Sequence, residues 1–296
     1  MANATRVYKF DPRSLPNEGV LVFVGKTGSG KSVLMEDILS YKRQYFKKAL
    51  IMTGSASASV TYAKHFPSIF IRDGEDAFDE GQLERLVAKQ EFLVKKCGCA
   101  RCKDEPGGKD PYVLRHCLCQ PLLLVLDDLG FMAKNIQKCR VVKRIFMNGR
   151  HFRILFLFSQ QYTRCLEPEM RSQVSHIFLC FEKNPANRAR IYDSYNTIFT
   201  NVKEFDKVML STTQNREVMV LSNSFSQSTA IADNVFWYKA PFPSLVWKMN
   251  EGGSAWRFHE ERFNPLYYTV GIESKTKKKD DGVLTVTKRN SHRVTR

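Results

Sequence analysis

Residues 25–32 combine the residue types that bind a phosphate group. The segment reads GKTGSGKS and matches the pattern G-x-x-x-x-G-K-[ST] in full. Glycines let backbone N–H groups approach phosphate oxygens, and a following helix directs its N-terminal amides at the same anion. We expect Lys31 to contact the β- and γ-phosphates of a nucleotide and the Ser32 hydroxyl to bind Mg²⁺. The predicted binding residues are Gly25, Lys26, Thr27, Gly28, Ser29, Gly30, Lys31 and Ser32.

Two adjacent acids follow an apolar run at residues 122–126. In a parallel sheet, the end of such a strand lies beside the phosphate loop that follows the first strand. Asp127 would hold Mg²⁺ through water, and Asp128 would polarise an attacking water, which predicts hydrolysis as well as binding. The alternative is a simple turn after a core strand.

A parallel sheet is the element that must position these motifs. Short apolar runs at 19–24, 49–53, 122–126, 154–158 and 176–181 indicate strands covered on both faces. Helical spacing at 32–39, 83–96 and 136–147 separates several of them. The alternation predicts a three-layer α/β sandwich with a mostly parallel sheet. Beyond residue 221 we expect irregular structure.

The charge is strongly positive, with 46 Lys and Arg against 30 Asp and Glu and a formal net charge of +16. Residues 274–296 contain eight of the cations and two Asp, so this basic tail carries +6 and the rest of the chain +10. A basic body favours a polyanionic partner such as nucleic acid, less often an anionic membrane surface; solubility is the alternative. Residues 1–19 lack an apolar core and the apolar runs are too short to cross a bilayer, so we expect no membrane span and a reducing compartment.

Cysteines cluster in a segment rich in glycine and proline, residues 97–119, which reads as an insertion. Structural Zn²⁺ needs four thiolate or imidazole ligands in a tetrahedron, and such a site would order a segment with little apolar content. We predict a zinc site formed by Cys99, Cys102, Cys117 and Cys119, with Cys97 and His116 as alternates. A reduced loop without metal and redox-active thiols are the alternatives.

Three further stretches carry a resemblance to a known family: MNGRHFRI at 147–154, the strand ending in Ser159 and Gln160, and PEMR at 168–171. Over residues 20–195 the chain resembles the genome-packaging ATPases of nucleocytoplasmic large DNA viruses, within the FtsK/HerA-like group of DNA-pumping ATPases. The resemblance implies a RecA-like P-loop core over residues 1–273, assembly into a ring, and ATP-driven movement of double-stranded DNA into a capsid. It also implies a capsid or portal-like vertex component as partner, and a location at the viral assembly site in the host cytoplasm or on the virion.

The resemblance also implies roles for two polar residues. Gln160 resembles the glutamine that senses the γ-phosphate and its bound water, and Arg150 resembles the arginine offered to the nucleotide of a neighbouring subunit. Neighbouring basic residues compete for the latter role: Arg144, Arg153 and Arg171. Many ring ATPases carry Glu where this chain has Asp128, so the shorter carboxylate must lie slightly closer to the water.

Three other readings stay open at this point. A nucleoside or nucleotide kinase can combine a P-loop with a four-cysteine zinc lid, although in zinc-lid thymidine kinases the cysteines follow the second acidic motif, whereas here they precede it. A DNA helicase would share the same core. A zinc-stabilised DNA-binding scaffold without catalysis would not need Lys31, Ser32, Asp127 and Asp128 together.

Overall fold

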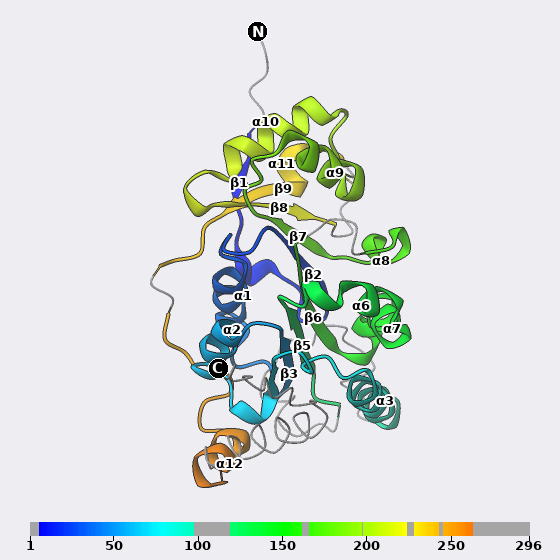
Figure 1. The fold of residues 1–296 in the computed structure, drawn as a ribbon, viewed down its shortest axis with the longest axis vertical. Coiled ribbons are helices and arrows are strands. Elements are labelled where there is room, and N and C mark those ends of the chain that lie inside the picture. Colours follow the sequence, from blue (N-terminus) through cyan, green and yellow to red (C-terminus); the bar gives the residue numbers. More distant parts are fainter. Residues whose placement is uncertain are drawn as a thin grey trace, which may run out of the picture.

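The computed structural model describes residues 6–97, 119–161, 166–196, 198–223, 228–242 and 245–262. Within them, a nine-stranded sheet runs through the molecule in the order β1-β9-β8-β7-β2-β6-β5-β3-β4 (Figure 1). Its strands are β1 (Tyr8–Lys9), β2 (Gly19–Val24), β3 (Lys48–Thr53), β4 (Ile71–Asp73), β5 (Leu122–Asp127), β6 (Ile154–Gln160), β7 (His176–Leu179), β8 (Val218–Ser222) and β9 (Val235–Tyr238). Strand β8 is antiparallel to both of its neighbours, and the other pairs are parallel. The predicted α/β fold with a mostly parallel sheet is confirmed.

Helices cover both faces of this sheet (Figure 1). One face packs against α1 (Lys31–Ser40) and α2 (Ala56–Ala63). The other face packs against α3 (Glu80–Lys96), α6 (Ala133–Lys138), α7 (Arg140–Asn148), α8 (Pro168–Ser172), α9 (Pro185–Tyr195) and α10 (Val202–Thr212). Shorter elements include η4 (Gly149–Phe152), η6 (Gln214–Arg216) and α11 (Ile231–Asn234), and α12 (Ser254–Arg262) ends the described part. Two apolar cores, one on each side, therefore enclose the sheet.

The central strands form where apolar runs have no alternation. Every residue of β2, β5, β6 and β7 is buried, because helices cover both of their faces.

The predicted helix over 136–147 is divided into α6 and α7 at Cys139, whose ψ of 117° is extended. The expectation of irregular structure beyond residue 221 is wrong for β9 and α12. Strand β9 has only four residues, and pairing with β8 on one side and β1 on the other defines it.

The strand ends place the sequence motifs at one edge of the sheet. Val24, the last residue of β2, pairs with Gln160 at the end of β6, and Thr53 pairs with Asp127 at the end of β5. Parallel strands bring their carboxyl ends to a common edge, where ligands bind in open α/β sheets. No helix in the described ranges is long and apolar enough to cross a bilayer. The predicted tail, 274–296, lies outside the described residues.

Candidate active site

The phosphate loop connects β2 to α1 with a conformation that its glycines make possible. Gly28 and Gly30 have φ values of 78° and 89°, which side chains with a Cβ rarely adopt. Gly25 is constrained by space, since a Cβ there would lie 2.6 Å from Ser29 Oγ and 2.7 Å from Cys180 Cβ. Its N–H donates to the Gln160 carbonyl over 3.1 Å, which ties the loop to the end of β6.

Lys31 lies across this loop. Its ammonium donates to the carbonyl oxygens of Gly25, at 2.7 Å, and Lys26, at 3.0 Å, and only 7% of the residue is exposed. Helix α1 begins at Lys31, so both this ammonium, held at Gly25 and Lys26, and the unpaired amides of the first helical turn border the loop. The loop therefore concentrates positive charge where an anion can reach it.

Asp127 is fully buried and accepts hydrogen bonds from three hydroxyl groups. The donors are Ser32 at 2.8 Å, Tyr62 at 3.0 Å and Ser159 at 2.6 Å. Burial first, and then the charge of Asp127, raises the pKa of Tyr62 well above its usual value, so the phenol stays protonated and donates. The Ser32 hydroxyl and the Asp127 carboxylate together are oxygen donors of the kind that Mg²⁺ prefers, so the residues present fit that ion.

Sequence reasoning missed two of those three donors. Ser159 carries a detectable signal, because it precedes the last residue of a buried strand that ends beside the acidic pair. Tyr62 comes from α2 and carries no such signal in the sequence. Only the folding of α2 against the sheet brings the phenol to Asp127.

Asp128 adopts a left-handed backbone conformation, with φ 52°. Gly54 packs against it so closely that a Cβ at residue 54 would lie 2.4 Å from the Asp128 carbonyl oxygen. The Asp128 N–H donates to Ser159 Oγ over 3.1 Å, and its carboxylate accepts a hydrogen bond from Gln161 Nε2 at 2.7 Å. The two adjacent carboxylates therefore have different donors: three hydroxyl groups for Asp127 and the Gln161 amide for Asp128.

The two glutamines at the end of β6 differ in their surroundings. Gln160 is 4% exposed; its amide donates to the Tyr195 hydroxyl, and its Oε1 is buried without a hydrogen-bond partner. Gln161 instead donates to Asp128 and lines a cavity beside the phosphate loop. The sensing role of Gln160 stays a prediction, and Gln161, which contacts Asp128, is a second candidate for the phosphate end of a nucleotide.

A cavity of about 540 Å³ lies between the phosphate loop and α9. Its lining includes Thr27, Gln161, Glu182, Asn187 and Arg190. Arg190 is exposed on α9 and was missed by sequence reasoning, because nothing in the sequence places that helix beside the loop.

Glu182 anchors the loop side of this cavity. It accepts a hydrogen bond from Lys26 Nζ at 2.9 Å. Burial acts to raise the pKa of the Glu182 carboxyl, but hydrogen bonds from the Asn184 backbone and Lys26 outweigh it and lower that pKa, so the group stays charged.

Arg144, Arg153 and Arg171 each contact other residues of the chain. Arg144 pairs with Glu91 and lies over the Phe152 ring. Arg153 is largely buried and donates to Glu18, Tyr45 and Cys119. These two arginines hold the fold together.

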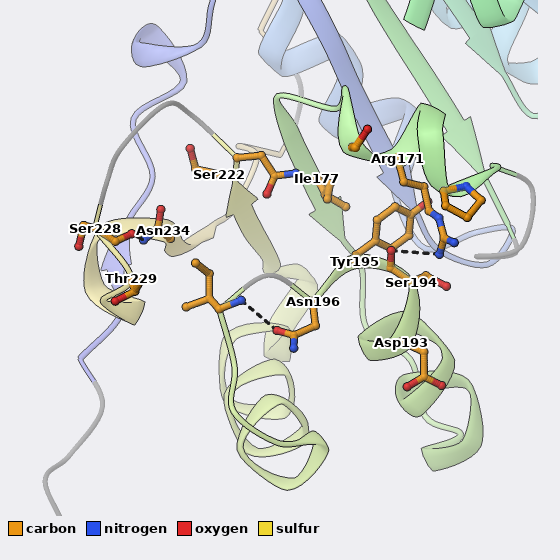
Figure 2. A pocket seen from close by; sticks show the side chains of 14 residues that line it. Arg171, Ile177, Asp193, Ser194, Tyr195, Asn196, Ser222, Ser228, Thr229 and Asn234 are labelled. Atoms are coloured by element: carbon orange, nitrogen blue, oxygen red, sulfur yellow. Dashed lines mark hydrogen bonds between the residues drawn. The ribbon is translucent and has the colours of Figure 1, made fainter. Parts of the chain in front are cut away.

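Arg171 lines a second cavity of about 550 Å³. Figure 2 shows its guanidinium directed at the end of α9, where NH1 donates to the Ser194 carbonyl over 3.1 Å. Tyr195, the partner of Gln160, lines the same cavity. Arg171 therefore connects α8 to α9, the helix whose Tyr195 accepts a hydrogen bond from Gln160.

Arg150 is exposed in η4 and lies far from its own phosphate loop. It lines a cavity with Gly19 and Val20, at the beginning of β2, whereas the loop follows the end of that strand. The length of the strand separates the two places by about 20 Å. Arg150 cannot contact a nucleotide bound to its own chain, which is compatible with a role toward a neighbouring copy.

Most of the cysteine cluster lies outside the described residues, including Cys99, Cys102, His116 and Cys117. Cys97 is half-buried at the end of α3, and Cys119 is buried before β5. Across the described part of the chain, no group of three or more His, Cys, Asp and Glu side chains could hold a metal ion. Zinc binding stays a prediction.

No protein-family model matches the chain. It is similar to the uncharacterised protein L437 of Acanthamoeba polyphaga mimivirus, with 26% identity over 90% of this chain and 87% of L437. The uncharacterised protein 088R of Invertebrate iridescent virus 3 is 30% identical over 77% of this chain and 78% of 088R. Among solved structures, the genome packaging NTPase B204 from Sulfolobus turreted icosahedral virus 2, in complex with AMP, matches 77% of this chain and 100% of its own, with a TM-score of 0.50 and 14% identity. The likeness to B204 shows a shared fold.

Proposed function

The chain belongs to the family of nucleocytoplasmic large DNA virus proteins that includes 088R, and from that premise we propose that it is an ATP-driven motor. The motor hydrolyses ATP to move double-stranded viral DNA into the capsid during virion assembly. It acts as a ring of identical subunits at a capsid or portal-like vertex, at the assembly site in the host cytoplasm. The shared fold with a genome packaging NTPase supports this proposal.

One arrangement carries the proposal: Ser32 donates a hydrogen bond to Asp127, and Gln161 donates one to the adjacent Asp128. A site that only binds a nucleotide needs the loop and Lys31. The Asp128 carboxylate, held by the Gln161 amide next to the loop cavity, can in addition accept a hydrogen bond from water. This arrangement supports hydrolysis.

Each residue has a separate task in this proposal. Lys31 and the first amides of α1 stabilise negative charge on the β- and γ-phosphates, and the loop residues 25–30 enclose them. Ser32 and Asp127 would hold Mg²⁺, which shields the phosphate oxygens when it is bound. Asp128 orients the attacking water, and Gln161 holds the Asp128 carboxylate in position.

Arg150 completes the site of the neighbouring subunit. Its exposed position at the opposite edge of the sheet supports this role, because an arginine acting between subunits must project from the surface away from its own nucleotide. A ring would place the η4 face of one chain against the phosphate-loop edge of the next.

The proposal keeps a structural zinc site at Cys99, Cys102, Cys117 and Cys119, within a domain that spans residues 1–273 and precedes the basic tail. Elemental analysis of protein purified without a metal-affinity tag should give one zinc per chain. The double variant Cys99→Ser/Cys102→Ser should lose the metal and still bind nucleotide. Metal-free fresh, reduced protein would refute the zinc assignment.

The function is tested by measuring ATP hydrolysis with and without long double-stranded DNA. We expect Mg²⁺-dependent hydrolysis that DNA stimulates and that Asp128→Asn abolishes. The matched control is Asp76→Asn, which neutralises an exposed carboxylate far from the loop in sequence. Phosphate transfer to a nucleoside, without stimulation by DNA, would show a kinase instead.

A further inference from the structure

A groove of about 1,020 Å³ lies beside the β1 end of the sheet, outside the nucleotide site. The residues that follow β1 and β9 and those that precede β8 form its walls, and Tyr41 at the end of α1 contributes a further ring. We call it the basic groove, defined by Lys9, Arg13, Tyr41, Arg216, Trp237 and Lys239.

Four cations line the basic groove: Lys9, Arg13, Arg216 and Lys239. All four are exposed, and none forms a salt bridge within the described ranges. The lining also contains Asp11 and Glu217, but Asp11 already accepts a hydrogen bond from the Arg13 backbone N–H. The groove therefore presents an excess of positive charge to solvent.

Aromatic rings hold three of these cations. Lys9 Nζ lies 5.8 Å from the centre of the Trp237 ring, Arg13 lies 6.0 Å from Tyr41, and Arg216 lies 5.6 Å from Phe242. Phe242 is 75% exposed. A cation over a ring loses little freedom on meeting an anion, because the ring already restricts its position.

The turn before β8 presents Arg216 in a conformation that costs energy. Asn215 and Arg216 have φ values of 53° and 66°, in the left-handed region that residues with a Cβ seldom adopt. Backbone conformations of this kind concentrate at binding sites, where they fix the direction of a side chain. Here the fixed side chain is a cation of the groove.

Paired residues on neighbouring strands connect the groove to the phosphate loop. From β2 to β1 these residues are Val24, Leu179, Met219, Trp237 and Lys9. Four steps between strands correspond to about 19 Å. The groove and the loop therefore lie at the same edge of one rigid sheet.

Helix α1 provides a second connection. It begins at Lys31 in the phosphate loop and is followed by Tyr41 in the groove. Its Asp37 accepts a hydrogen bond at 2.5 Å from Tyr238, which also lines the groove. A displacement of the first turn of α1 would move the ring that holds Arg13.

We propose that the basic groove binds the phosphate backbone of double-stranded DNA and that α1 couples this contact to the phosphate loop. The coupling rests on the proposed function; the DNA contact does not. The cations lie over the rings, so the groove offers charged groups for phosphates, and base stacking on these rings would require the cations to move away. This arrangement favours backbone contact, which is insensitive to sequence.

The test compares two triple variants of the full chain. Arg13→Gln/Arg216→Gln/Lys239→Gln removes three groove cations, and Arg85→Gln/Lys89→Gln/Lys134→Gln removes three exposed cations from α3 and α6 as a matched control. Binding to a fluorescent 30-base-pair duplex is measured by anisotropy over a range of salt concentrations. The basic tail is present in both variants and contributes equally.

The groove variant should lower the slope of log K against log salt by about 2 to 3, since each phosphate contact contributes roughly 0.9. The control should leave the slope near that of the native chain. Basal ATP hydrolysis should stay unchanged in both, while stimulation by DNA should be lost only in the groove variant. The charge-preserving variant Arg216→Lys should keep the native slope.

Other results would overturn the proposal. Equal slopes in the two triple variants would show that the groove does not bind the backbone. If the groove variant lost affinity for single-stranded DNA but kept its affinity for the duplex, the rings would bind bases. If the groove variant bound DNA more weakly but its ATP hydrolysis were still stimulated by DNA, the coupling through α1 would be disproved. If the native chain hydrolyses no ATP, the proposed function and the coupling fail, and the salt slopes still decide the DNA contact.

Discussion

The Ser32 hydroxyl donates to the Asp127 carboxylate over 2.8 Å and joins two motifs that lie 95 residues apart. Tyr62 and Ser159 donate to the same carboxylate from two further elements. A buried carboxylate with three hydroxyl donors is held in one orientation, because each bond lost would leave a buried charge less well satisfied. The Ser32–Asp127 contact is therefore fixed before any ligand binds.

Lys31 and Asp128 should separate nucleotide binding from hydrolysis. Lys31→Ala removes a charge that contacts phosphate in the ground state, so nucleotide affinity should fall roughly ten- to a hundredfold. Asp128→Asn should bind ATP nearly as well as the native chain and lose about 10²- to 10⁴-fold in kcat, because Asp128 acts on the water. Titration with a fluorescent ATP analogue and steady-state kinetics check both values. Native hydrolysis by Asp128→Asn would contradict the assignment.

Gln161 and Gln160 should respond differently to the same substitution. Gln161→Ala removes the amide that holds Asp128, so kcat should fall roughly ten- to a hundredfold with little change in thermal stability. Gln160→Ala removes the hydrogen bond from the Gln160 amide to the buried Tyr195 hydroxyl and should lower the free energy of unfolding by about 1 kcal/mol. Kinetics and urea unfolding on both variants check the difference. A catalytic loss confined to Gln160→Ala would support the sensing role of Gln160.

Arg150 should act on a neighbouring subunit. Activity per chain should rise with protein concentration as rings form. Arg150→Ala should lose on the order of 10³-fold in kcat, and so should Lys31→Ala. Mixing these two inactive variants should restore partial activity, since some interfaces then pair an intact loop with an intact arginine. An inactive mixture whose co-assembly is confirmed by size-exclusion chromatography would exclude Arg150, and Arg171→Ala would then be mixed in the same way.

His176 should make the stability of the fold depend on pH below neutrality. Burial first, and then the charge of Lys42, lowers the pKa of His176 to about 4. The unfolded chain binds a proton near pH 6.5 and the folded chain does not, so stability falls as pH decreases from 6.5 toward 4. Between pH 7 and pH 5 this histidine alone should cost about 2 kcal/mol.

Urea unfolding at the two pH values measures this effect. His176→Gln should show a smaller loss of stability between pH 7 and pH 5 than the native chain, by about that amount. His151→Gln, at an exposed histidine, is the control and should behave like the native chain. An equal loss of stability in His176→Gln and the native chain would show that His176 titrates normally.

The sequence by itself determined the fold class and the position of the phosphate loop. Apolar runs without alternation identify buried parallel strands, because covering both faces leaves no polar positions. The loop at 25–32 follows such a strand, and its pattern of glycines, Lys31 and Ser32 depends on local backbone chemistry. These features are contained in short segments and need no knowledge of distant contacts.

The tertiary structure decided which side chains meet. Tyr62 reaches Asp127 only because α2 packs against the sheet, and Gln161, which follows β6, reaches Asp128, which follows β5. Four-residue β9 became a strand through its neighbours, and the groove cations gathered from three separate segments. Contacts between distant segments depend on the packing of whole elements, and a local pattern of residue types does not encode that packing.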